Sequence, residues 1–336
     1  MSKNIYIISI GKLFRKYNNL YFIDKDKKKR AIPLENISNI FILNKVSITY
    51  NALKLIADRN IFLHFFYENR EKGIFYHLGS FVPKHKNPAG IIHIKQALAY
   101  NDIQKRSEIA LEIVDATRYN MIKVLEKYSE IKDYVQRLRS YNVKEEFKRN
   151  FNDWKNSINI ILGIESNIWQ IFYDALDKVL KTYKLEKRTR RPPRNEANAI
   201  VSFSNMLLYS QVLSEIYKTH LDPTISFLHE PFERRFSLAL DFAEPFKPII
   251  TFRILIWLIN QDMIKSEHFV KGLDSILLNE YGRKLVIKEF DKRIDETIKI
   301  KGKGRKSIKT FIRKQCYNLE RYLIEEYPFE AFRLRY

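Results

Sequence analysis

The chain has 336 residues, with 60 lysines and arginines against 39 aspartates and glutamates, which gives a formal charge of +21. Apolar residues make up 45% of it, which excludes bulk disorder and leaves ample material for a core. The positive charge indicates a polyanionic partner, of which nucleic acid is the first candidate and an anionic membrane surface the second.

Strand patterns fill the first 84 residues, and we expect a small β-rich domain there, either a sheet or a sandwich. The sequence TYNALKLIAD interrupts them with apolar residues at helical spacing, which predicts a short helix at 49–58. His64, inside the apolar run IFLHFFY, is better explained as a hydrogen-bonded core histidine than as a catalytic one. Strands are expected at 5–10, 20–23, 31–34, 37–43, 61–67 and 74–78.

A linker is expected at 85–94, because prolines and a glycine surround the sequence KHKNPA. Beyond it the apolar residues keep a helical period, which predicts an all-α domain over residues 95–336 and an α+β protein as a whole. Helices are expected at 95–128, 135–151, 158–183, 197–218, 249–260, 266–273, 283–300 and 307–326.

Glu165 stands out as an acid on an otherwise apolar helical segment, beside Gly163. A negative charge near the start of a helix interacts favourably with the helix dipole, and by itself this explains the residue without any catalytic role.

The sequence KTYKLEKRTRRPPR, at 181–194, holds seven basic residues and one acid. Its two prolines stop a helix and stiffen the loop, so that its arginines could be presented to phosphates. A second basic tract, KIKGKGRKSIK at 299–309, has six basic residues and no acid. Either tract could equally be a solvated run of charge.

The stretch at 222–248 contains His229 and two acids three residues apart, Asp241 and Glu244. On a helix this spacing places both carboxylates on one face, where they repel each other. A cation between them, with His229 as a nitrogen ligand, would relieve the repulsion, and such mixed ligands suit manganese better than magnesium. Alternatively, His229 caps a turn and the acids pair with Arg234 and Arg235.

Two further features exclude classes of protein. The most apolar run, at 249–259, is short and contains Arg253, so it predicts a buried helix rather than a membrane span. A single cysteine, Cys316, excludes an internal disulfide and a cysteine-rich zinc site. The start of the chain is too interrupted by charge for a signal peptide, and we expect a cytoplasmic protein.

Taken together, several stretches resemble the CRISPR-associated integrase family, the larger of the two universal proteins of spacer acquisition in antiviral defence. They are GIESN, RTRRPPRNEANAIVSFSNMLLY, LDPTISFLHEP and SLALDFAEPFKP, followed by LNEYGRKL. The likeness covers most of residues 90–336. It implies a metal-dependent DNA endonuclease and integrase, which inserts DNA fragments into a CRISPR array by attack of a 3′-hydroxyl on a phosphate of the repeat.

The resemblance also implies roles for particular residues. Glu165, His229 and Glu244 would bind Mn²⁺ or Mg²⁺, with Asp241 as an additional catalytic acid beside them. The family more often has Asp where Glu244 stands. The residues implied in DNA binding are Arg188, Arg190, Arg191, Arg194 and Lys247.

The partners that the resemblance implies are double-stranded DNA, a second copy of the chain joined through the β-rich domain, and a small ferredoxin-like protein. No membrane is implied. Three alternatives stay open: a stand-alone metal nuclease of branched DNA, a non-catalytic nucleic-acid scaffold in which the acids and His229 hold helices together, and a protein that binds a membrane surface.

Overall fold

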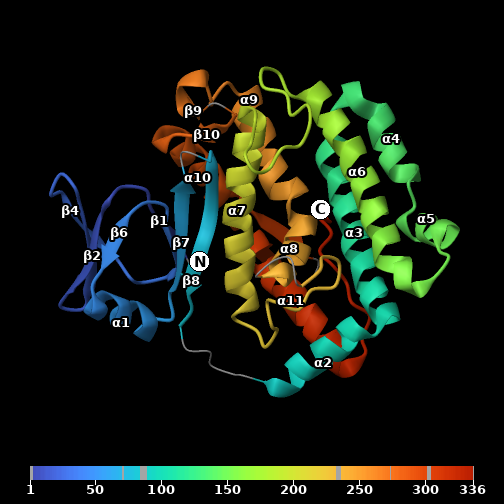
Figure 1. The fold of residues 1–336 in the computed structure, drawn as a ribbon, viewed down its shortest axis with the longest axis horizontal. Helices are drawn as coiled ribbons and strands as arrows, with labels where there is room; N and C mark the ends of the chain where they lie inside the picture. The colour runs from blue at the N-terminus through green and yellow to red at the C-terminus, as the bar shows by residue number, and fades with distance from the viewer. Residues whose placement is uncertain are drawn as a thin grey trace.

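Two four-stranded sheets lie against each other in the first part of the chain, beside a larger body of helices (Figure 1). The structure is a computed structural model, which describes residues 3–69, 72–83, 89–231, 236–272, 274–300 and 304–335. The first sheet has the strand order β1 (Lys3–Ile7), β5 (Ile37–Ile42), β7 (Phe62–Asn69) and β8 (Ile74–Phe81). The second has the order β4 (Lys29–Ile32), β3 (Asn19–Asp24), β2 (Gly11–Lys16) and β6 (Val46–Ile48).

Strand β5 joins the β-rich part to the helices, because its side chains alternate between two cores. Ile40 and Ile42 enter the core between the sheets, which also includes helix α1 (Tyr50–Asp58). Phe41 points the other way, into the core of the helical body. The two parts therefore share a buried interface.

Helix α7 (Glu196–Ile216) is the central element of that interface, with the first sheet on one side and helices on the other (Figure 1). It is buried along almost its whole length. His64 of β7 lies 2.8 Å from Ser214 on α7 and 2.8 Å from Ser80 on β8, one contact for each ring nitrogen. The prediction of a hydrogen-bonded core histidine is confirmed.

The rest of the helical body lies on the other side of α7, and within it α3 and α6 lie side by side (Figure 1). Its other helices are α2 (Gly90–Asn101), α3 (Ile103–Leu125), α4 (Lys132–Ser140), α5 (Val143–Asn150), α6 (Ser157–Val179), α8 (Ser237–Ala243), α9 (Arg253–Asn260), α10 (Glu280–Asp295) and α11 (Ile308–Glu325). None of the helices in the described ranges combines the length and the apolar character needed to cross a bilayer.

The α+β fold class is as expected, but the helical body is not all-α. The segment expected to be helical at 266–273 contains strand β9 (Phe269–Lys271), which pairs with β10 (Ile276–Leu278). The helix expected at 283–300 ends at Asp295, and the alternating sequence that follows forms β11 (Thr297–Ile300), paired with β12 (Gly304–Ser307).

Other boundaries also differ from expectation. The single helix expected at 135–151 is two helices, α4 and α5, because Asn142 caps the start of α5. The single helix expected at 95–128 is broken at Asp102, whose side chain caps α3 by accepting hydrogen bonds from the backbone of Gln104 and Lys105. Helix α2 begins at Gly90, so the second half of the expected linker is helical, and residues 84–88 lie outside the described ranges.

Candidate metal centre

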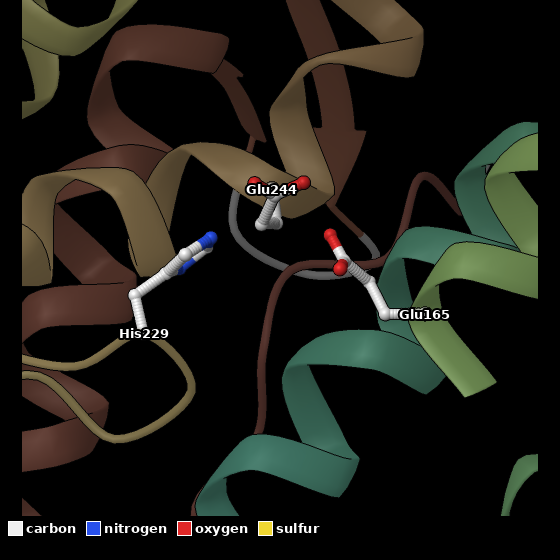
Figure 2. A group of neighbouring side chains, drawn as sticks. All are labelled: Glu165, His229 and Glu244. Carbon is white, nitrogen blue, oxygen red and sulfur yellow. The ribbon is translucent and has the colours of Figure 1, made fainter. Parts of the chain in front are cut away.

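Three segments far apart in the sequence bring Glu165, His229 and Glu244 together (Figure 2). Glu165 lies on α6, His229 in the loop before α8, and Glu244 at the first position after α8. One ligand atom of each residue lies within 4.8 Å of those of the other two. Among the described residues, this is the group of histidine and acidic side chains close enough together to hold a metal ion.

The backbone around Glu244 is irregular because Pro245 has no N–H to continue an α-helix. Helix α8 gives way to a 3-10 turn at Glu244–Phe246, and a π-turn follows at Pro248–Phe252. Departures of this kind are frequent at functional sites. Glu244 therefore lies at a bend in the backbone, where contacts with neighbouring residues, and not a regular helix, determine the direction of its side chain.

Asp241 does not share a cation with Glu244, which corrects the hypothesis drawn from their spacing. Both of its oxygens are used elsewhere: Oδ2 accepts the backbone N–H groups of Phe227 (2.7 Å) and Leu228 (2.9 Å). Oδ1 accepts the backbone N–H of His229 (3.1 Å) and lies 2.8 Å from its Nδ1. Asp241 is fully buried, and it therefore fixes the loop and the ring of His229.

The contact with Asp241 also sets the chemistry of the imidazole. With Nδ1 hydrogen-bonded to the carboxylate, Nε2 is the nitrogen that faces the two glutamates. Burial lowers the pKa of His229, but the carboxylates of Asp241, Glu244 and Glu165 outweigh it, and the net shift is upward. The arginines of the alternative pairing, Arg234 and Arg235, lie outside the described residues.

Burial, followed by repulsion from Glu244, raises the pKa of Glu165 to about 7. The carboxyl group is also held by Trp169, whose Nε1 donates to Oε1 over 3.2 Å. Sequence reasoning missed Trp169, although its position four residues after Glu165 on one helix placed it on the same face.

Lys247 was expected to bind DNA, but the structure buries its side chain at the metal centre. Its ammonium pairs with Oε1 of Glu244 and lies 5.7 Å from the ring centre of Trp169 and 5.5 Å from that of Tyr209. Burial works to lower the pKa of Lys247, but Glu244 raises it more, so the group stays charged. Buried in this way, Lys247 is poorly accessible to DNA that lies on the protein surface.

The donor set fits a divalent metal ion. It offers one imidazole nitrogen and carboxylate oxygens, a mixture that suits Mn²⁺ and is acceptable to Mg²⁺. In the described part of the chain, Oε2 of Glu244 is buried without a hydrogen-bond partner, so one strong acceptor is left over inside the cluster.

The arginine loop divides into one half-buried arginine, which the protein holds, and three exposed ones. Arg188 donates to Asn198 (2.8 Å) and Ser202 (3.1 Å) on α7 and to the carbonyl of Thr189, and burial lowers its pKa to about 10. The exposed arginines are Arg190, Arg191 and Arg194. The described residues of the second basic tract lie in the paired strands β11 and β12 and at the start of α11, and residues 301–303 lie outside the described ranges.

Comparisons with known proteins agree over the whole chain. A family model described as CRISPR associated protein Cas1 matches residues 5–292. The CRISPR-associated endonuclease Cas1 of Nanoarchaeum equitans is 66% identical over 334 residues, which cover 99% of this chain and 100% of that protein.

Solved structures give the same result. A CAS1 protein from Thermotoga maritima has a TM-score of 0.83 at 34% identity, covering 99% of this chain and 100% of that one. Two chains share the fold at lower identity. A casposase bound to integration product has a TM-score of 0.80 at 19% identity, covering 99% of this chain and 96% of that one. A chain of a Cas6-RT-Cas1–Cas2 complex has a TM-score of 0.78 at 18%, covering 100% of this chain and 36% of that one.

Proposed function

The chain belongs to the Cas1 family of CRISPR-associated proteins, and from this premise we propose that it is a metal-dependent DNA endonuclease and integrase. Its substrate is double-stranded DNA, and its reaction joins the 3′-hydroxyl of a DNA fragment to a phosphate of the CRISPR repeat. One observation carries the proposal: the donor atoms of Glu165, His229 and Glu244 lie within 4.8 Å of one another.

Glu165, His229 and Glu244 would hold the ion, with Mn²⁺ or Mg²⁺ as the cofactor. When bound, the ion supplies a Lewis acid that stabilises charge on the phosphate and on the entering and leaving oxygens. Asp241 holds the imidazole ring so that Nε2 faces the ion, and Trp169 orients the carboxylate of Glu165.

Lys247 adds a fixed positive charge within the same pocket. Its ammonium pairs with Glu244 and lies near the rings of Trp169 and Tyr209, so it is already oriented before substrate arrives. A scissile phosphate at the metal centre would gain a charge-assisted contact with it, which stabilises the additional negative charge of the transition state. We therefore assign Lys247 to the reacting phosphate rather than to the flanking DNA.

The DNA on either side is assigned to Arg190, Arg191 and Arg194, which are exposed and therefore accessible to phosphates. The partners proposed are a second copy of the chain and a small ferredoxin-like protein of the Cas2 type. The names of two structures with this fold, one bound to an integration product and one a Cas1–Cas2 complex, support a role in integration and this partner.

A strand-transfer assay tests the proposal. A labelled DNA fragment, a plasmid carrying a repeat and the candidate partner are incubated with the protein in Mn²⁺, beside a Glu165→Gln, Glu244→Gln double variant. We expect joined products from the parent alone. Cleavage of branched DNA without joining would favour the stand-alone nuclease, and activity equal in both proteins would refute the metal centre.

A further inference from the structure

The segment that carries Glu244 has two faces with different neighbours. Asp241, Glu244 and Lys247, three residues apart, belong to the metal centre described above. Phe242, Pro245 and Phe246 belong to the opposite face. Against that second face lies an extended stretch that follows α11, residues 327–335, named here the strap (Figure 1).

Aromatic rings of the strap stack on the rear of the segment. The ring of Phe332 lies parallel to that of Phe246, with centroids 4.8 Å apart, and the ring of Phe329 lies parallel to that of Phe242 at 6.2 Å. All four side chains are buried. Removing such a ring from a core leaves a cavity, toward which the surrounding residues shift in part.

Two buried amides then tie the strap and the segment together. Asn120 on α3 donates to the carbonyl of Pro245 (2.7 Å) and to that of Phe332 (2.9 Å), and its oxygen accepts the N–H of Leu334 (2.7 Å). Gln315 on α11 donates to the carbonyl of Phe242 (3.1 Å) and accepts the N–H of Phe332 (2.8 Å). Each amide therefore contacts both the strap and the segment that carries Glu244.

The strap is also anchored independently of the segment. Arg333 pairs with Glu112 and with Asp115 (2.8 Å) on α3, and the N–H of Ala331 donates to Glu112 over 3.0 Å. The strap therefore has a fixed position, against which the segment behind Glu244 is held.

We propose that the strap is a positioning element for Glu244, so that binding of the metal ion depends on residues at the far side of its ligand. The inference rests on the proposed function. A metal ion requires its donors within a few tenths of an ångström of fixed positions. Because Glu244 lies in a 3-10 turn beside a proline, the regular helical ladder does not supply that precision, and contacts from Asn120, Gln315 and Phe332 supply it instead.

The test is the affinity of the metal-free full-length protein for Mn²⁺, measured by electron paramagnetic resonance of the free ion, for Phe332→Ala. Residues that orient a metal ligand typically change affinity by about 10–100-fold when they are removed, and we expect a reduction in that range. Tyr327→Ala is the matched control, because it also removes a ring from the strap, but one that is half exposed and contacts Arg321. Its affinity should equal that of the parent.

Measurements at 25 °C on samples shown to be folded by circular dichroism separate positioning from stability. A purely structural strap would lower the melting temperature of Phe332→Ala but leave Mn²⁺ affinity within about twofold, and that result would overturn the inference. If Phe332→Ala does not fold, Gln315→Met is the second variant, since it removes two hydrogen bonds and keeps the volume. The same reduction in affinity is expected, and an unchanged affinity overturns the inference.

The parent protein distinguishes this inference from the function on which it depends. A parent that binds Mn²⁺ no better than His229→Ala would refute the metal centre and the inference with it. A parent that binds Mn²⁺ more tightly than His229→Ala, beside a folded Phe332→Ala variant of equal affinity, would refute the strap's role alone.

Discussion

The metal centre and the arginine loop lie close enough for the charge of Arg190 to lower the pKa of Glu165, yet they are assembled differently. The candidate metal centre takes its proposed ligands from three segments, and each of them is supported by a neighbour: Asp241 holds His229, Trp169 holds Glu165, and Pro245 behind Glu244 is bound by Asn120. In the loop, four arginines come from seven consecutive residues, and one of them is held by the protein.

This difference separates two kinds of charged site, one buried and one exposed. Buried charges must be balanced and oriented by neighbours, so each one depends on residues that never touch substrate. Exposed arginines need only be present, because contacts with phosphates are strong over a range of geometries and carry no sequence information. A single substitution at the metal centre should therefore cause a large loss of activity, whereas each substitution in the exposed part of the loop should cause a small loss of DNA affinity.

The largest effect is expected for His229→Ala, which removes a ligand from the metal centre. Strand transfer in Mn²⁺ should fall by about 10²–10³-fold or more, as for other losses of charge stabilisation. The melting temperature should change little, because Asp241 keeps its three backbone donors. His93→Ala, on α2 outside the metal centre, is the control. A variant that integrates normally but melts several degrees lower would show that His229 is structural.

Asp241→Asn should lower both the stability of the protein and its affinity for Mn²⁺, because Asp241 holds a loop as well as the ring of His229. The amide NH₂ group would face N–H donors that now meet a carboxylate oxygen. We expect about 1–3 kcal/mol lower stability to urea and about 10–100-fold weaker Mn²⁺ binding. If the parent and the Asp241→Asn variant bind Mn²⁺ with equal affinity, His229 is positioned without the Asp241 carboxylate.

The pH dependence should have opposite signs for stability and for metal binding. The metal-free folded protein keeps a proton on Glu165 up to about pH 7, whereas the unfolded chain loses it near 4.5, so stability falls as pH rises through this window. The raised pKa of His229 acts in the same direction. Mn²⁺ requires both groups deprotonated, so its affinity should rise by about tenfold per pH unit for each proton displaced, and level off above pH 7.

Melting curves in EDTA and Mn²⁺ titrations between pH 5.5 and 8 measure the two trends. Glu165→Gln removes one titrating group and should flatten the stability profile. Metal-free protein that grows more stable between pH 5 and 7 would contradict the burial of Glu165.

The smallest effect is expected in the arginine loop. Arg190→Ala with Arg194→Ala should lower the slope of log affinity against log salt by about 0.9 for each duplex phosphate that the variant no longer binds, equally for all sequences. Arg188→Ala should instead lower the melting temperature, because Arg188 donates to Asn198 and Ser202. If Arg188→Ala changes the slope as much as the pair does, the division between half-buried and exposed arginines is wrong.

The sequence predicted the α+β class, a β-rich start and most helices, because apolar spacing determines which face of each element is buried. Strands β2 and β6 of the second sheet were not predicted. The grouping of Glu165, His229 and Glu244 was predicted through a family resemblance, since spacing alone related only Asp241 to Glu244. That relation failed because it assumed a regular helix, whereas the backbone changes to a 3-10 turn at Glu244. The role of Arg188 was missed because its partners lie on α7, after two prolines.

Local pairing and irregular structure were hardest to predict. Strands of three or four residues, such as β9 and β11, are too short for their alternation to outweigh a helical pattern nearby. The strap has no period at all: its buried residues are fixed by contacts with α3 and α11 that no window of sequence contains.

The position of the strap near the end of the chain also has a consequence during synthesis of the protein, because the strap is made after the segment that it contacts. Phe332 is made 87 residues after Pro245 (332 − 245), which at about 5–20 residues per second is a delay of roughly 4–17 s. Throughout that interval the nascent chain already contains the three proposed metal ligands, but it lacks the ring of Phe332 that stacks on Phe246. A metal centre that is positioned by a later part of the chain would bind its ion with low affinity until that part has been made and the helical body has folded.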